Sequence, residues 1–249
     1  LTGKKFDTRS QFEVYNDLKK NNANVSVIVP HSYHQLYYPQ GEVFPFSGLS
    51  ISKTVYRNEN GYYFIYLSDR HGFNNPDKEW DAKEIEYLII GDSFAHGASV
   101  NRPDDIASVL RKLSKKAVLN LGYSDNGPLT EYATLREFIT PKVKNILWLY
   151  FEGNDFLNLN REIQSEILKK YLYDPNFSQN LKSKQNIIDI KVKEIIGKEQ
   201  LRRQKNLEFS LTKEAFNFLK IFRTRYLIFG KKFKEPDKFI PEFKLILNK

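Results

Sequence analysis

The 249-residue chain changes its pattern of hydrophobic and polar positions between residues 85 and 151. Short apolar runs with the length of buried strands cover residues 85–90, 117–121 and 145–151. Helical stripes separate these runs, over residues 103–113 and 129–139. This alternation is typical of parallel β-α-β units, so it predicts an α/β fold of three layers, with a parallel sheet between helices.

Pro103 is expected to open the first of these helices, because proline favours the first helical position and Asp104 and Asp105 follow it. The apolar side chains of this helix share one face, which comprises Ile106, Val109, Leu110 and Leu113. We therefore expect an amphipathic helix between the first two strands.

Residues 1–84 follow other patterns. Residues 9–20 have helical spacing and residues 25–29 have the composition of a short strand. Two β-rich runs on either side of a turn at Gly61 predict a hairpin over residues 51–67. We therefore expect an N-terminal α+β segment over residues 1–84, followed by a domain over residues 85–249.

The strand pattern fades after residue 156. Helical patterns cover residues 158–173, 181–208 and 213–229, and another begins at residue 240. The third has an aromatic face, more typical of packing than of ligand binding, made of Ala215, Phe218, Leu219, Phe222 and Tyr226. These patterns predict a helical insertion over residues 156–239.

Basic residues are concentrated in this last part of the chain. The first 155 residues hold 18 Lys and Arg against 19 Asp and Glu, whereas the remaining 94 hold 21 against 11. A solvated helical surface is the simplest explanation. The alternative is contact with an anionic membrane surface or an acidic glycan, tested by charge reversal at Lys231, Lys232 and Lys234. No nucleic-acid motif accompanies the charge, so no nucleic acid is expected.

The composition excludes several classes of site. The chain has no cysteine, so it has no disulfide, no Cys-ligated metal and no cysteine nucleophile. No apolar run reaches the roughly 18–20 residues of a membrane-spanning helix. The chain has no methionine, and a helical pattern continues to Lys249, so we expect a fragment of a longer protein. Its location is open, with the cell envelope as the working hypothesis.

Polar residues follow each of the three predicted strands. The segments are Gly91-Asp92-Ser93, Asn120-Leu121-Gly122 and Gly153-Asn154-Asp155. Because parallel strands end at the same edge of a sheet, Ser93, Gly122 and Asn154 are expected to lie together. A serine hydroxyl, a glycine N–H and an asparagine amide form a nucleophile with an oxyanion hole, as acyl transfer requires.

These segments resemble the first three motifs of the SGNH (GDSL-type) hydrolases, in the same order and at similar separation, over residues 69–160. The segment Asp69–Asn75 is similar to a Gly-Phe-Arg/Asn element that precedes the domain in many bacterial members. The resemblance implies that Ser93 is the nucleophile, that the N–H groups of Ser93 and Gly122 and the Asn154 side chain bind the oxyanion, and that Asp92 shapes the turn.

The resemblance also implies an activity. It is the hydrolysis of acyl esters, or O-acyl transfer, through an acyl-enzyme and without a metal or organic cofactor. The expected substrates are acylated glycans or small esters.

The sequence departs from the family in one respect. The fourth motif, an Asp-x-x-His that supplies the general base, has no match, because no histidine follows His96. Either the motif lies outside these residues, which the interrupted helix at Lys249 favours, or the protein is a non-catalytic envelope binding module. In both cases we expect these 249 residues to have little esterase activity.

Other residues near the motifs have more than one interpretation. His96 is a candidate substitute base, although a histidine in a turn or at the rim of the site is the commoner arrangement. Asp155 either orients Asn154 or caps the following helix. His31 and His34 have the spacing of metal ligands but lack a third ligand nearby, so a polar loop is expected, and His71 is expected in a loop. Asn126 and Gly127 either line the site or form a turn.

Overall fold

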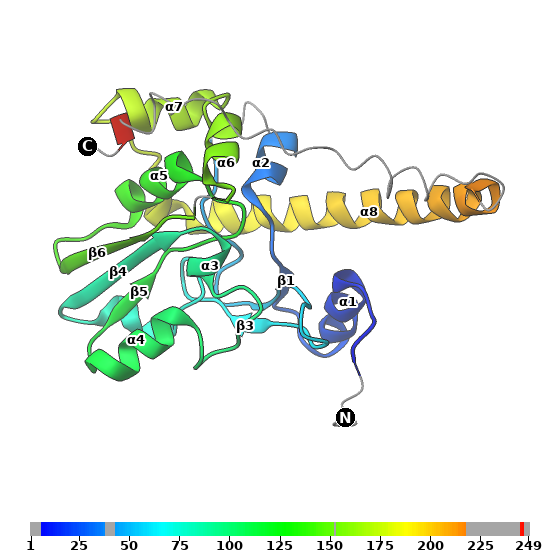
Figure 1. Ribbon diagram of the computed structural model, residues 1–249, viewed down its shortest axis with the longest axis horizontal. Helices are drawn as coiled ribbons and strands as arrows, with labels where there is room; N and C mark the ends of the chain where they lie inside the picture. Colours follow the sequence, from blue (N-terminus) through cyan, green and yellow to red (C-terminus); the bar gives the residue numbers. More distant parts are fainter. Residues whose placement is uncertain (1–5, 38–42, 152, 218–244, 247–249) are drawn as a thin grey trace.

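The computed structural model describes residues 6–37, 43–151, 153–217 and 245–246, with the backbone alone over 207–217. The chain has a mixed α/β fold, which confirms the predicted class (Figure 1). Its centre is a parallel sheet with the strand order β5-β4-β6, and a second three-stranded sheet has the order β1-β2-β3. The described helices include none that is both long and apolar enough to span a bilayer.

The N-terminal segment forms the second sheet and its helices. The elements are α1 (Gln11–Asn21), β1 (Val25–Val27), α2 (His31–Tyr37), β2 (Lys53–Val55), β3 (Ile65–Leu67) and the 3-10 helix η1 (Asp77–Asp81). Helix α1 begins at a capping box, in which the Ser10 side chain accepts the Glu13 N–H and the Glu13 carboxylate accepts the Ser10 N–H. Strand β2 pairs with β1 in parallel and with β3 antiparallel, so the predicted helix, strand and hairpin are confirmed.

The segment that contains His31 and His34 differs from the expectation. It forms helix α2 instead of a polar loop, and both histidine side chains are buried. Phe44 covers them, with its ring centroid 5.9 Å from that of His31 and 5.8 Å from that of His34. The polar appearance of the segment was misleading because this aromatic cover comes from another part of the chain.

The central sheet consists of β4 (Ile85–Gly91), β5 (Val118–Asn120) and β6 (Val143–Leu149). Both β5 and β6 pair with β4 in parallel, as predicted. Alternate residues of β4 point to opposite faces. Leu88 and Ile90 pack in the same buried cluster as Leu129 of α5 (Pro128–Phe138), whereas Ile89 packs with Ala107 of α4 (Ile106–Ser114). Helices therefore contact the sheet on both faces.

Helix α4 begins later than predicted. Its N-cap is Asp105, whose side chain accepts the Ser108 N–H at 3.0 Å, so Pro103 lies in the preceding turn. Ala107 is the residue of this helix that is fully buried, whereas Ile106, Val109 and Leu113 are exposed. The short Ala107 side chain lets the helix lie close to Ile89, and this turns the larger apolar residues toward solvent.

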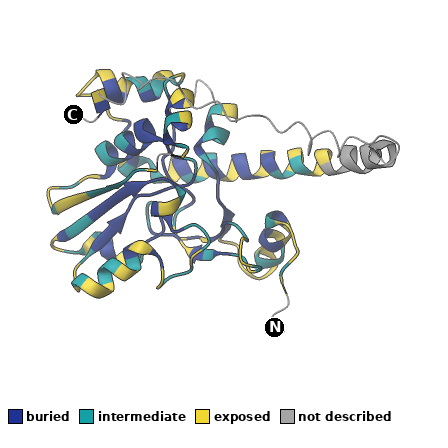
Figure 2. Ribbon diagram, viewed as in Figure 1, coloured by how far each residue is buried: buried dark blue, intermediate teal, exposed yellow. Residues whose placement is uncertain are grey.

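Four further elements follow β6, namely α6 (Asp155–Glu162), α7 (Glu166–Tyr173), the 3-10 helix η2 (Leu181–Lys184) and α8 (Gln185–Asn217). The predicted helix over 158–173 is thus broken at residues 163–165. Helix α8 is longer than predicted and extends away from the sheets (Figure 1). Buried and exposed residues alternate along its described side chains (Figure 2). Lys231, Lys232, Lys234 and most of the aromatic face predicted for residues 213–229 lie outside the described residues.

One buried core spans the sequence boundary at residue 84. Phe46, Phe64 and Phe73 of the N-terminal segment belong to the same cluster as Leu88 and Tyr123 of the second part. Burial of large aromatic side chains of this kind is the main favourable contribution to folding. The two segments therefore share the apolar surface that stabilises them.

Gly91 ends β4 with a φ of +151°, and a Cβ there would lie 2.7 Å from the Leu149 carbonyl oxygen and 2.8 Å from the Ala95 Cβ. We expect Gly91→Ala to lower the free energy of unfolding by about 2 kcal/mol or more, because both neighbours are packed. Gly197 in α8 is the matched control, since a Cβ there meets nothing within 4 Å. Gly197→Ala should raise the free energy of unfolding by about 0.5–1 kcal/mol. Urea unfolding of both variants checks this, and equal effects would contradict it.

Candidate active site

Ser93 lies at the carboxyl end of the central strand of the parallel sheet. It is the first residue of the short helix α3 (Ser93–His96) and is partly exposed. The Asp92 side chain caps this helix by accepting the Phe94 N–H at 2.8 Å. Asp92 thus shapes the turn that presents Ser93, in the manner that the resemblance implies.

Gly122 follows β5 and lies against α3. A Cβ at Gly122 would be 2.5 Å from the Ala95 Cβ and 2.7 Å from the His96 nitrogen, so only glycine allows this approach. The Gly122 N–H donates to the Asn120 side-chain oxygen at 2.9 Å. The structure therefore brings Gly122 beside the helix of Ser93, with its N–H already bonded within the second motif.

Asn154 follows β6 and is the N-cap residue of α6. Burial raises the pKa of the neighbouring Asp92 carboxyl, and the Asn154 side-chain amide acts in the opposite direction without cancelling that increase. The Asn154 side-chain oxygen is buried and has no hydrogen-bond partner among the described residues. Asn154 and the Ser93 turn are thus in contact through Asp92.

Asp155 has a different role from the two that were expected. Its carboxylate accepts the Phe151 N–H at 2.7 Å and closes the turn between β6 and α6. Burial raises the pKa of Asp155 to about 7, because the charged form is poorly solvated there. The negative charges of Asp92 and Glu162 act in the same direction.

Two further buried carboxyl groups near this edge were not predicted from the sequence. Glu162 of α6 accepts the N–H groups of Gly127 and Leu129, at 2.7 and 3.0 Å, and so binds the start of α5. Glu131 accepts the Trp148 indole N–H at 2.5 Å, and burial raises its pKa well above the usual range. Asn126 is fully buried beside them, so the loop before α5 is packed rather than open.

His96 is fully buried, so the expectation of a rim histidine is wrong. Its Nε2 atom lies 3.0 Å from the Tyr66 hydroxyl, and its ring is 4.9 Å from that of Tyr56 and 5.1 Å from that of Tyr123. Burial lowers the pKa of His96 to about 3. The imidazole is therefore neutral and surrounded by tyrosines, which gives the substitute-base hypothesis no support.

His31 and His34 are also buried, and His71 is partly buried. Burial lowers the pKa of His31 to about 4 and that of His34 well below its usual range. His71 lies in a turn, as expected, with its ring 4.6 Å from that of Trp80. Across the described residues, no three His, Asp or Glu side chains are arranged to hold a metal ion.

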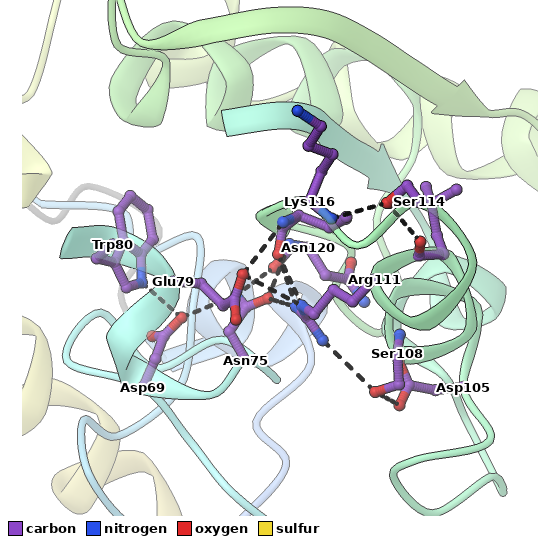
Figure 3. Close-up of polar contacts among 12 residues, drawn as sticks. Asp69, Asn75, Glu79, Trp80, Asp105, Ser108, Arg111, Ser114, Lys116 and Asn120 are labelled. Atoms are coloured by element: carbon purple, nitrogen blue, oxygen red, sulfur yellow. Dashed lines mark hydrogen bonds and ion pairs between the residues drawn. The ribbon is translucent and has the colours of Figure 1, made fainter. Parts of the chain in front are cut away.

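A network of polar side chains that includes Asp69, Asn75 and Asn120 lies next to the site (Figure 3). The Asn75 side chain accepts the Asn120 N–H and donates to the Asn120 carbonyl, both at 2.8 Å. Asn120 in turn donates from its side chain to the Ala95 carbonyl at 2.6 Å, and Asn74 donates to the His96 carbonyl at 2.9 Å. The upstream segment Asp69–Asn75 thus holds both β5 and α3. In the sequence, this segment stood out only by its resemblance to a Gly-Phe-Arg/Asn element, and these contacts were not predicted.

Comparison of the chain with protein-family models, with curated proteins and with solved structures finds no match. The functional argument therefore depends on the residues and their arrangement.

His96→Gln tests the burial of this imidazole through the pH dependence of stability. The pKa is 6.5 when unperturbed and about 3 in the folded protein, so below pH 6.5 the unfolded chain binds a proton that the folded protein does not. Stability that is present above pH 6.5 is thus lost as the pH falls. Between pH 8 and pH 5 the free energy of unfolding of the wild type should fall about 2 kcal/mol further than that of His96→Gln. Urea unfolding at each pH measures both free energies. If they change in parallel with pH, His96 is solvated in the folded protein and the prediction is contradicted.

Proposed function

We propose that the chain carries an acyl-ester site of the SGNH hydrolase type, with Ser93 as the nucleophile and the three-layer α/β/α arrangement of that family. One observation carries the proposal: the three motifs stand at the carboxyl ends of three adjacent parallel strands, and Ser93 follows the central one. Gly122 follows the strand on one side and Asn154 follows the strand on the other. This order supports a serine nucleophile with oxyanion donors on either side, the set of groups that acyl transfer uses.

In the proposed reaction the Ser93 Oγ attacks the ester carbonyl carbon, and the Ser93 proton passes to a general base. The bond to the alcohol then breaks, the alcohol takes up the proton, and the acyl group remains on Ser93. Water or an acceptor alcohol attacks this acyl-enzyme and restores the serine. Oxyanion binding requires the Gly122 N–H to exchange its bond to Asn120 for one to the substrate.

The proposed reaction needs a general base, and the four histidines of the sequence do not supply it. His31, His34 and His96 are buried, and His71 packs against Trp80 and Phe138. The same observation, together with the internally bonded Gly122 N–H, favours a second candidate function. In that case the chain is a non-catalytic binding module that retains the arrangement of Ser93, Gly122 and Asn154.

Labelling by a fluorophosphonate distinguishes the two functions, measured on the intact 249-residue chain by mass spectrometry. We expect slow labelling that added imidazole accelerates, because imidazole replaces the missing base and the oxyanion donors still act. Ser93→Ala should abolish the label, and Ser183→Ala, at an exposed serine, should leave it unchanged. If imidazole produces no label that depends on Ser93, the nucleophile is wrongly assigned and the binding module is favoured.

Turnover without added base is a separate prediction. A serine without its base is a poor nucleophile near neutral pH, so residues 1–249 should hydrolyse an activated acetyl ester little faster than Ser93→Ala does. Release of p-nitrophenol from its acetate measures this rate. Robust turnover that depends on Ser93 would show that another group of the chain acts as base.

A further inference from the structure

Two large apolar side chains are exposed beside Ser93. Phe94, the next residue, is 58% exposed, and Phe151, two residues after the neighbouring strand β6, is 42% exposed. Their ring centroids are 4.8 Å apart and their planes are inclined by 50°. Leu157, one helical turn after Asn154, is also exposed. The carboxyl edge of the sheet thus presents an apolar surface next to the candidate nucleophile.

The backbone holds this pair of rings in place. A Cβ on Gly153 would lie 2.6 Å from two atoms of the Phe151 ring, so the ring rests on the backbone of the third motif. Phe94 is held by the α3 cap, since its N–H donates to Asp92. The two rings are therefore carried by the same two turns that present Ser93 and Asn154. Contiguous exposed apolar side chains of this kind mark binding surfaces more often than single ones do.

We propose that Phe94 and Phe151 bind the apolar acyl chain of the ester, and this rests on the proposed function of Ser93. In the acyl-enzyme the alcohol has left and the acyl chain stays attached to Ser93 Oγ, beside Phe94. Phenylalanine rings have no polar group, so they favour hydrocarbon over a hydroxylated or charged group. The substrate class is therefore an ester of a fatty acid with several carbons rather than an acetate.

The absence of cysteine allows a test that does not require catalysis. Ser93→Cys places the single thiol of the chain where the acyl chain would be attached. Methyl or hexyl groups are then joined to it as mixed disulfides, and 2-mercaptoethanol displaces them by thiol–disulfide exchange, which releases the protein thiol and a small disulfide. The position of this equilibrium, measured by intact mass spectrometry, reports how well the surface holds each chain.

The hexyl group has five more methylene groups than the methyl group. If half of their surface is covered by the two rings, the exchange equilibrium should favour the hexyl adduct over the methyl adduct by about tenfold or more. Phe94→Ala and Phe151→Ala, each added to Ser93→Cys, should remove most of this preference. Tyr173→Ala, at an exposed aromatic residue of α7, should retain it. Ser183→Cys in the otherwise unchanged chain places the thiol at an exposed position. The chain-length preference measured there comes from the reagents alone and is subtracted.

The outcomes separate this inference from the proposed function. No chain-length preference at position 93, or one that both phenylalanine variants retain, overturns the acyl surface even if a fluorophosphonate labels Ser93. A preference that depends on Phe94 and Phe151 supports the surface even if Ser93 is never labelled. Thermal unfolding of each variant checks that it is folded, and Phe94→Leu, which remains apolar, should retain part of the preference.

Discussion

The paired hydrogen bonds between Asn75 and Asn120 hold the candidate site together. Strand β5 is at the edge of the described sheet, and the Asn75 amide bonds both backbone groups of Asn120 as a neighbouring strand would. The Asn120 side chain is thereby free to hold Gly122 on one side and Ala95 on the other. The position of the second motif relative to Ser93 depends on these amides.

Asp69 stabilises the same network at a cost in desolvation. Its carboxylate accepts the N–H groups of His71 and Phe73, the Asn75 amide and the Trp80 indole. Burial nevertheless raises the pKa of Asp69 to about 6, because four donors do not fully replace water. The Arg111 guanidinium bonds the Asn75 side-chain oxygen and joins α4 to the network. An N-terminal loop, a helix and a strand edge are thus linked by buried polar contacts as well as by the shared core.

The sequence predicted the parts of the fold that depend on local periodicity. Strands 85–90, 117–121 and 145–151 and their parallel order follow from apolar runs alternating with helices, and this order places the three motifs side by side. Other features depend on residues distant in the chain. Helix α2 was missed because Phe44 covers its histidines, and the environment of His96 requires tyrosines at positions 56, 66 and 123. The partners of Gly122 and Asp155 likewise follow from tertiary packing, which periodicity does not report.

The buried carboxyl groups change the charge of the folded protein. The formal value of +9 counts every Asp and Glu as ionised at pH 7. Asp155, with a pKa of about 7, holds a proton in about half of the molecules at that pH. Burial raises the pKa of Glu131 as well. The carboxyl groups of the folded chain therefore carry less negative charge at pH 7 than the composition indicates. On unfolding at neutral pH Asp155 releases its proton, whereas buried histidines such as His96 regain their ability to bind one, so proton exchange with a weakly buffered solution reports the loss of this interior.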